Sequence, residues 1–339
     1  MKAVKNVATS GNPVDIELGK KLLCQGAVGG MGAILLAGGM GTRLGYPHPK
    51  GIYPILPGLS LFEIFARKVK EASHLAKRPL FFAIMTSPDN DAETRGFFSS
   101  RQYFGLDEKQ LFFFSQGSLP MEDDEGRPLK QQAADGNGSL FLHFDQSGLL
   151  SLWEEEGIQF LNILLVDNPL ADPFDPNLLG FHAKSGADVT VKCIERRSPE
   201  EKVGLLVENQ GKLSVVEYSE IDPSENRARN PDTTLKHRYA NLSLFCLSLP
   251  FAKSLATKSF PFHRAKKPLS TAPGSPLAWK KERFIFDLLP FAENPKLLVY
   301  PRETCFAPLK NREGPDSPET VRAAFIAARG DGSRDSRHS

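Results

Sequence analysis

The sequence predicts an α/β protein in which an open sheet carries helices on both faces. Short apolar runs typical of buried parallel strands recur along the chain, among them Ala33–Ala37 and Phe160–Val166. Segments with apolar residues at helical spacing, such as Leu61–Ala76, lie between them. Such alternation of strand and helix is the pattern of a sheet whose strands are joined by crossover helices.

The remaining elements follow the same alternation. A polar loop rich in Pro, Asn, Arg and Ser at Asp222–Thr234 is expected to form a lid or shoulder over the sheet edge. A second polar loop is expected at His263–Ala278. We predict helices around Ile16–Cys24, Phe174–His182 and Ile285–Ala292, a helix end at Ser151–Glu156, strands at Leu80–Met85, Leu111–Phe114, Asp188–Ile194 and Lys296–Tyr300, and short alternating strands over Val203–Ser219.

The composition divides the chain into one large domain and two flanking pieces. Residues 1–30 are interpreted as a short lead-in, and residues 31–311 as the domain itself. Residues 312–339 are rich in Arg, Asp, Gly and Ser, so we expect a polar, disordered tail with a short helical segment near Thr320–Ala328.

Bulk properties narrow the class of partners. The 339 residues carry a formal net charge of +2, which does not indicate a general nucleic-acid or membrane-surface binder. No apolar run has the length of a membrane span, and the N-terminus lacks the pattern of a secretory signal. Four widely spaced cysteines are expected to be reduced thiols, which favours a cytoplasmic location; they are Cys24, Cys193, Cys246 and Cys305.

The strongest local motif is the glycine-rich stretch Leu36–Lys50, LAGGMGTRLGYPHPK, which follows a predicted strand. Glycine backbone can approach phosphate oxygens closely and aim several N–H groups at them. Arg43 and Lys50 add two positive charges to the same loop, so it suits a triphosphate. It matches neither the GxxxxGK[ST] phosphate loop nor the GxGxxG dinucleotide fingerprint.

Two further motifs are weaker alone. The DGNG of Asp135–Gly138 is by itself only a turn. Asp167 directly follows the strand Phe160–Val166, at the edge where open α/β sheets bind ligands. A carboxylate there can hold Mg²⁺ against phosphates, although an isolated Asp-Asn is more often a cap of a helix or turn.

Taken in order, these motifs resemble the eukaryotic-type UDP-N-acetylglucosamine pyrophosphorylases, within the UTP-dependent sugar-1-phosphate uridylyltransferases. The resemblance runs from Leu36 to about Asn311. Along it stand LAGGMGTRLGYPHPKGIYPI, IMTS, YFGL, FFFSQGSLP, ADGNGSLF, VDNPLADPFDP, VGLLVE, VVEYSEI, ERFIFDLLPFA and FAPLKN. It implies a nucleotide-diphospho-sugar transferase fold, of the GT-A or Rossmann-like kind with a mixed sheet, and makes residues 31–311 a catalytic uridylyltransferase domain.

The resemblance also implies the ligands, UTP and a sugar 1-phosphate with Mg²⁺ as cofactor, and a role for each matched residue. For UTP these are Leu36, Ala37, Gly38 and Gly39 at the base and phosphates, Lys50 at the triphosphate, Gln116 and Gly136 at the uracil, and Asp167 at the nucleotide and its metal ion. For the sugar phosphate they are Asn137, Glu217, Tyr218, Asn241 and Lys310. Arg43, Lys50, Lys280 and Lys310 are the expected catalytic cations, with Lys280 open to a slip of one position onto Lys281.

The chain departs from the family in three places. Relatives have a longer segment before the glycine loop and continue beyond the PLKN motif into a further domain. They also commonly have a glycine directly before the matched asparagine, where this chain has Ala240 before Asn241. The methyl group of Ala240 is expected to alter the sugar pocket. N-acetylglucosamine 1-phosphate is the expected acceptor. UTP–glucose-1-phosphate uridylyltransferase is the alternative within the class, and an inactive UDP-sugar-binding protein the alternative outside it.

Overall fold

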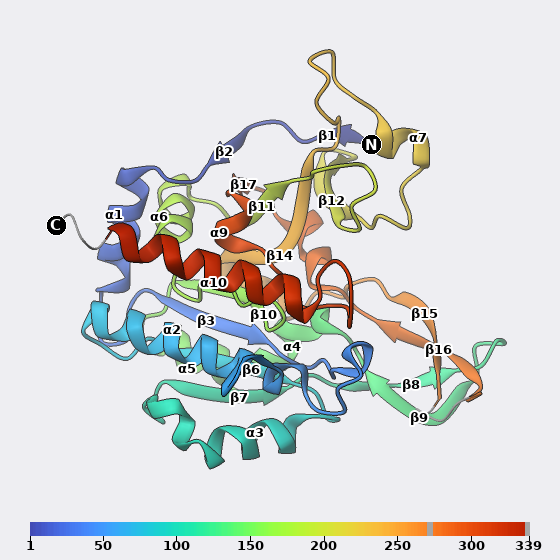
Figure 1. The fold of residues 1–339 in the computed structure, drawn as a ribbon, viewed down its shortest axis with the longest axis horizontal. Helices are drawn as coiled ribbons and strands as arrows, with labels where there is room; N and C mark the ends of the chain where they lie inside the picture. The colour runs from blue at the N-terminus through green and yellow to red at the C-terminus, as the bar shows by residue number, and fades with distance from the viewer. Residues whose placement is uncertain (270–273, 336–339) are drawn as a thin grey trace.

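A computed structural model describes residues 1–269 and 274–335, with residues 331–335 described by their backbone alone. Its centre is an eleven-stranded mixed sheet with the strand order β2-β17-β11-β14-β10-β3-β6-β7, extended by β1, β12 and β13 (Figure 1). These strands are β1 Lys2–Ala3, β2 Val7–Thr9, β3 Met31–Leu36, β6 Phe82–Thr86, β7 Leu111–Ser115, β10 Phe160–Leu165, β11 Val189–Glu195, β12 Gly204–Asn209, β13 Lys212–Val216, β14 Tyr239–Ser248 and β17 Pro295–Val299.

The centre of the sheet is parallel. Strands β10, β3, β6 and β7 run side by side in the same direction, so their carboxyl ends share one edge. All six residues of β3 are buried, as expected for a strand covered on both faces. The predicted mixed α/β fold is therefore confirmed, and the predicted strands at Ala33–Ala37, Leu80–Met85, Leu111–Phe114 and Phe160–Val166 correspond to four neighbouring strands of this sheet.

Strand β14 was not predicted. It lies antiparallel between β10 and β11 and makes the sheet mixed. Its register against β11 shifts between Lys192 and Cys193, close to Ser243, whose φ of 53° is unusual for a residue with a side chain. The irregularity locally turns the strand where Asn241 lies.

Two apolar cores lie on the two faces of the sheet. Alternate residues of β3 point to opposite sides, with Ala33 and Leu35 in one core and Ile34 and Leu36 in the other. The first core is covered by α1 Pro13–Leu23, α2 Leu61–Ala76, α3 Asp91–Ser100, α6 Pro176–Ser185 and α10 Pro318–Asp335. The second is covered by α4 Leu140–Gln146, α5 Leu149–Glu155, α8 Leu249–Leu255 and the 3₁₀ helix η5 Ile285–Phe291.

Residues 1–30 are part of the sheet layer rather than a mere lead-in. Strand β2 pairs with β17, and β1 pairs with β12. Helix α1, predicted around Ile16–Cys24, packs closely on α6, because a Cβ at Gly19 would lie 1.8 Å from the carbonyl oxygen of Pro176. Only glycine permits this approach of the two backbones.

A small second sheet has the order β15-β16-β8-β9 and extends from the main body (Figure 1). The predicted polar loop at His263–Ala278 is therefore wrong for residues 263–268 and 277–278, which lie in strands, while residues 270–273 lie outside the described part. Its strands lack apolar alternation and are joined by charge pairs, since Glu122 binds both Arg264 and Lys281. The strands are β8 Ser118–Glu122, β9 Pro128–Ala134, β15 His263–Pro268 and β16 Leu277–Glu282.

The end of the chain corrects the expectation of a disordered tail. Residues 318–335 form α10, twice the length of the short segment predicted. Val321 and Phe325, one turn apart, are buried in the first core, and the guanidinium of Arg322 donates to the carbonyl oxygen of Ile55 at 2.8 Å. The polar composition misled because two apolar residues at i and i+4 are enough to dock the helix. Residues 336–339 lie outside the described part.

The predicted loop at Asp222–Thr234 is largely irregular but includes the short helix α7 Pro223–Arg227. Over the described residues, no helix combines the length and apolarity that crossing a membrane requires. The remaining short elements are η1 Thr42–Leu44, η2 Lys50–Ile52, β4 Pro54–Leu56, β5 Leu59–Ser60, η3 Gln102–Gly105, η4 Asn137–Ser139 and α9 Arg302–Cys305.

Candidate active site

The glycine loop leaves the carboxyl end of β3 beside the end of β10. Leu36 and Leu165 are paired in parallel register, and the main-chain N–H of Val166 donates to the carbonyl oxygen of Leu36 at 3.1 Å. The N–H of Ala37 donates to Met85 on β6 at 2.8 Å. The loop and Asp167 therefore emerge together from the middle of the sheet, where open α/β folds bind ligands.

The loop folds back on itself and brings its two ends together. The N–H of Lys50 donates to the carbonyl oxygen of Gly39 at 3.0 Å, and the N–H of Gly41 donates to that of His48 at 2.9 Å. A Cβ added at Gly39 would meet no protein atom within 4 Å, whereas one at Gly38 would lie 2.6 Å from the amide nitrogen of Gln116. Gly38 thus packs on Gln116, and Gly39 faces open space.

Lys50 and Asp167 form the charged centre of this edge. The ammonium of Lys50 lies 3.5 Å from one carboxylate oxygen of Asp167, and the two side chains are only 20% and 14% exposed. The other carboxylate oxygen, Oδ1, is buried and has no hydrogen-bond partner among the described residues. A buried, unpartnered carboxylate oxygen is a suitable ligand for a hard divalent cation.

The other three predicted cations differ in their surroundings. Lys310 follows Leu309, whose N–H donates to the carbonyl oxygen of Asp167 at 2.8 Å, so its segment joins the site. Arg43 is exposed in η1, and it forms no ion pair with the acidic side chains of residues 1–269 and 274–330. Lys280 lies on β16, where its ammonium is 2.7 Å from Glu282 within the small sheet. The neighbouring Lys281 pairs with Glu122.

The DGNG turn is held by the segment that precedes η5. Gly136 has φ +95°, and a Cβ there would lie 2.3 Å from the carbonyl oxygen of Arg283. The N–H of Gly138 donates to that oxygen at 2.9 Å, and the side-chain oxygen of Asn137 accepts from the N–H of Ile285 at 2.9 Å. Sequence reasoning recognised ERFIFDLLPFA only as a family motif and assigned none of its residues to the site, although it forms one wall of the turn.

His143 connects this turn to the Gln116 segment. Its Nε2 accepts from the N–H of Gly117 at 2.9 Å and lies 3.1 Å from a carboxylate oxygen of Asp135. The hydroxyl of Ser139 donates to the other oxygen of Asp135 at 2.8 Å. The two segments predicted to contact the uracil are therefore brought together by side chains that the sequence analysis did not single out.

Three of the residues predicted for the sugar lie near β12, β13 and β14, since Glu217 and Tyr218 directly follow β13 and Asn241 lies on β14, whereas Asn137 lies in η4. Asn241 pairs in register with Gly204, and a Cβ at Gly204 would lie 3.1 Å from a carboxylate oxygen of Glu217. Burial, reinforced by Glu220, raises the pKa of Glu217, and Lys310 opposes that rise. Glu217 and Lys310 therefore interact electrostatically. This interaction connects the residues predicted for the sugar with those predicted for the phosphates. Tyr218 is 45% exposed.

Ala240, which replaces the glycine common in relatives, directs its side chain away from that of Asn241. Ala240 is fully buried in the first apolar core. Because side chains alternate along a strand, the methyl group points to the opposite face from Asn241. The amide of Asn241 instead contacts Ser243, accepting from its N–H at 3.0 Å.

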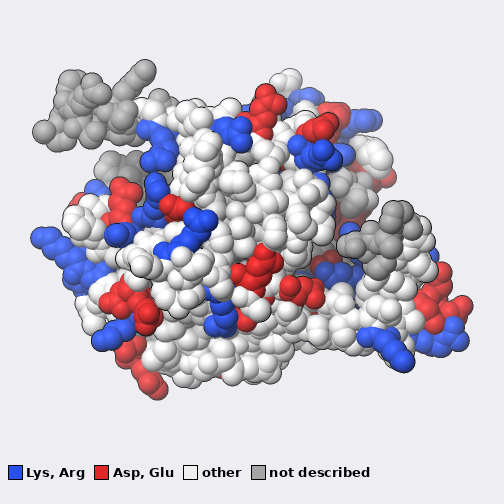
Figure 2. Space-filling view, turned by 60° about the horizontal axis from the view of Figure 1, so that its bottom comes forward, with Lys and Arg blue, Asp and Glu red and all other residues white. Residues whose placement is uncertain are grey.

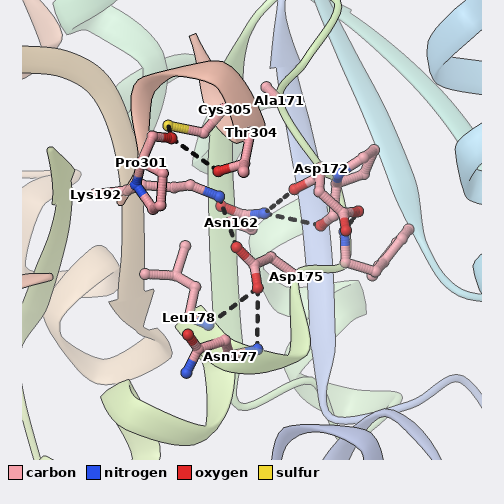
Figure 3. Close-up of polar contacts among 12 residues, drawn as sticks. Asn162, Ala171, Asp172, Asp175, Asn177, Leu178, Lys192, Pro301, Thr304 and Cys305 are labelled. Carbon is pink, nitrogen blue, oxygen red and sulfur yellow. Dashed lines mark hydrogen bonds and ion pairs between the residues drawn. The ribbon is translucent and has the colours of Figure 1, made fainter. Parts of the chain in front are cut away.

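A buried polar cluster that includes Asn162, Asp175 and Lys192 fixes the chain segment that follows Asp167 (Figure 3). The ammonium of Lys192 lies 2.6 Å from Asp175, which caps α6, and the amide of Asn162 donates to the carbonyl oxygens of Asp172 and Pro173. Burial opposes ionisation of Asp175, but the adjacent Lys192 ammonium holds the pKa of this carboxyl below its usual value. Such a paired buried charge fixes the backbone rather than offering a reactive group.

The ammonium of Lys68 also binds this segment, because it donates to the carbonyl oxygens of Pro169 and Ala171 at 2.7 Å each. Burial lowers the pKa of Lys68 to about 8. Among the described residues, no cluster of three or more His, Cys, Asp or Glu side chains is arranged to hold a metal ion. A cation at Asp167 would therefore complete its shell with water and substrate oxygens.

The four cysteines are free thiols, as expected. On the face shown in Figure 2, acidic and basic side chains are interspersed and do not form one basic patch.

Comparison with known proteins places this site in context. Residues 20–260 match the family described as UTP–glucose-1-phosphate uridylyltransferase. UDP-N-acetylglucosamine diphosphorylase 1 of Arabidopsis thaliana is 37% identical over 336 residues, which cover 91% of this chain and 66% of that protein. The chain therefore spans just under two thirds of that relative's length.

Solved structures agree. The uridine diphosphate N-acetylglucosamine pyrophosphorylase of Trypanosoma brucei, solved with an inhibitor, superposes with a TM-score of 0.85 at 30% identity, covering 95% of this chain and 71% of that one. A UDP-glucose phosphorylase of the same organism has a TM-score of 0.75 at 18% identity, covering 91% and 68%. The second likeness concerns the fold alone.

Proposed function

Because the chain belongs to the UTP–glucose-1-phosphate uridylyltransferase family, we propose that it transfers UMP from UTP to a sugar 1-phosphate and releases pyrophosphate. The observation that carries the proposal is the convergence of three segments at one sheet edge. The open backbone at Gly39, the Lys50–Asp167 pair and the Lys310 segment all meet there. This is a site for two polyanions.

The residues present match the demands of such a reaction. A sugar 1-phosphate is itself an anionic nucleophile near neutral pH, so the protein need not supply one. The enzyme must align the two anions and neutralise charge on the α-phosphorus and the departing pyrophosphate. Backbone N–H groups at Gly38 and Gly39, with Arg43, Lys50 and Lys310, would supply that neutralisation. Lys280 is retained as a further candidate, although its ion pair within the small sheet must first open.

Mg²⁺ is part of the proposal, with Asp167 as its protein ligand. The buried, unpartnered Oδ1 of Asp167 supports this assignment. When bound, the ion would neutralise phosphate charge. Lys50, released from Asp167, would then be available to the triphosphate. Asp167 also fixes Leu309 through its main-chain oxygen, so one residue orients both the cation site and the Lys310 segment.

We propose N-acetylglucosamine 1-phosphate as the acceptor. The Arabidopsis and trypanosomal relatives named for this sugar are 37% and 30% identical, against 18% for the UDP-glucose enzyme. Glu217, Tyr218, Asn137 and Asn241 would bind the sugar. The structure removes one objection, because the methyl group of Ala240 is buried away from Asn241. The four free thiols fit a reducing compartment, which we propose is the cytoplasm.

The test is pyrophosphate release from UTP, Mg²⁺ and each of two sugar phosphates. A pocket built for the acetamido group leaves polar groups unpaired with glucose 1-phosphate, at about 1–3 kcal/mol per group. We therefore expect kcat/KM for N-acetylglucosamine 1-phosphate to exceed that for glucose 1-phosphate by roughly tenfold or more. A preference for glucose 1-phosphate would instead identify the glucose enzyme.

A matched variant makes this test sharper. Glu217→Gln should lower kcat/KM for the sugar phosphate while leaving UTP affinity unchanged, because Glu217 is one of the residues predicted for the sugar. UTP binding without pyrophosphate release from either sugar phosphate would support an inactive UDP-sugar-binding protein and refute the enzymatic proposal.

A further inference from the structure

Lys310 begins a short closed loop that ends at Asp316. The N–H groups of Lys310 and Asn311 both donate to the main-chain carbonyl oxygen of Asp316, at 2.8 and 3.1 Å. The amide of Asn311 donates to the carbonyl oxygen of Pro315 at 2.7 Å, which closes the loop from the other side. The two ends are thus held together, and the side chains of Lys310 and Asp316 lie on the same closed turn.

Asp316 holds an unusual backbone conformation. Its φ is +59°, in the left-handed region that costs a residue with a side chain of order 1 kcal/mol. Glycine at this position would remove that cost. Ser317 stands between Asp316 and α10, and the N–H of Val321 donates to the carbonyl oxygen of Ser317 at 3.0 Å. The docking of Val321 and Phe325 in the core therefore fixes Asp316 in place.

The carboxylate of Asp316 faces the charges of the proposed active site. One of its oxygens lies 4.0 Å from the ammonium of Lys310, and the two side chains are about one third exposed. Burial raises the pKa of Asp316; Lys310 opposes the rise, and the negative charge of Asp167 adds to it. Asp316 is thus close enough to interact with both Lys310 and Asp167.

Other neighbours restrict where the Lys310 ammonium can go. It lies 5.6 Å from the centre of the Phe306 ring, within the range of a cation–π contact. Arg302 interacts electrostatically with Asp316 and contacts the same Phe306 ring. Arg302 is itself ion-paired with Glu201, whose negative charge also raises the pKa of Asp316. Lys310 is therefore the cation whose pairing with Asp316 the geometry supports.

We propose that Asp316 is a positioning residue for the reaction, whose carboxylate holds the Lys310 ammonium at the entrance of the phosphate site and aims it at the reacting phosphates. The inference rests on the proposed uridylyltransferase function and adds a residue to which neither the motifs nor the family match gave a role. Asp316 itself touches no reacting atom. Its effect acts through Lys310, so it must vanish when Lys310 is removed.

The experiment is a double-mutant cycle measured by pyrophosphate release. Asp316→Asn removes the charge, while Asn tolerates the left-handed backbone. We expect this variant to lower kcat about tenfold with the KM for UTP within about threefold, because a misplaced cation weakens stabilisation of the transition state more than substrate binding. In a Lys310→Ala background, the same substitution should change kcat less than twofold.

Two controls separate positioning from structure. Asp145→Asn, on the exposed end of α4, should leave kcat unchanged. Asp316→Gly relieves the backbone strain yet lacks the carboxylate, so it should lose kcat as Asp316→Asn does, even if the Asn variant folds poorly.

The outcomes are distinct. The positioning role is overturned if Asp316→Asn lowers kcat equally with and without Lys310, or if neither Asp316 variant lowers kcat. The uridylyltransferase proposal stands in both cases. Absence of turnover in the unaltered chain counts against both. A loss confined to the background that retains Lys310 supports the proposal.

Discussion

Gly39 offers a way to separate ligand binding from folding. A Cβ there meets no protein atom within 4 Å, and the backbone is not in the left-handed region, so Gly39→Ala should change the free energy of unfolding by less than about 1 kcal/mol. The methyl group would instead occupy the space proposed for phosphate oxygens. Losing one charge-assisted hydrogen bond from the backbone costs about 1.5–3 kcal/mol. The Kd for UTP, measured by titration calorimetry, should therefore rise by about 10- to 100-fold.

Gly136→Ala is the contrasting variant. At φ +95° the added Cβ would lie 2.3 Å from the carbonyl oxygen of Arg283, a main-chain atom that cannot simply rotate away. Backbone strain of about 1–3 kcal/mol adds to the loss of hydrogen bonds that hold the turn, about 1 kcal/mol each. We expect Tm to fall by roughly 10 °C in thermal unfolding. An unchanged UTP Kd in a stable Gly39→Ala variant would refute the placement of the phosphates on this loop.

Three other predictions concern charge. Arg43→Ala should lower kcat by about 100-fold with an unchanged Tm, since its charge acts mainly in the transition state; a near-normal kcat would reject this role. Activity should vanish in EDTA and return with Mg²⁺, and Asp167→Asn should raise the Mg²⁺ requirement tenfold or more; full turnover in EDTA would contradict it. Burial lowers the pKa of His182 to about 4, so as pH falls from 6.5 to 4 the unfolded chain gains a proton that the folded chain does not, and up to about 3 kcal/mol of stability is lost. The free energy of unfolding, measured with urea at several pH values, should fall less steeply between pH 6.5 and 4 for His182→Gln than for the unaltered chain. An equal pH dependence in the two proteins would exclude His182 as the cause of the lost stability.

The central strands and α2 were predictable because each carries its burial pattern in consecutive residues. Strand β3 is apolar throughout because helices cover both faces of the sheet. Helix α2 begins and ends where predicted, at Leu61 and Ala76, with the hydroxyl of Ser60 accepting from the N–H of Glu63 at its start. Local periodicity and local capping were sufficient for these elements.

The elements that were missed depend on partners far along the chain. Strand β14 gains its place only by pairing with β10 and β11. The polar strands β15 and β16 are stabilised by charges such as Glu122 on β8, which lies 159 positions before Lys281. Helix α10 was predicted only in part, near Thr320–Ala328, because the docking of Val321 and Phe325 depends on a core that distant segments build. None of these partners can be inferred from a window of neighbouring residues.

The same division applies to the candidate site. The glycine loop and Asp167 follow strands directly, so their motifs indicate a phosphate site at the sheet edge. The contacts that complete it join distant segments: Asn137 accepts from Ile285, and Asp167 accepts from Leu309. A motif gives the chemistry of a residue, whereas these contacts determine which charges share a space. Asp316 shows the difference most clearly, since in sequence it is one polar residue of a polar loop, and in the fold its carboxylate lies 4.0 Å from Lys310.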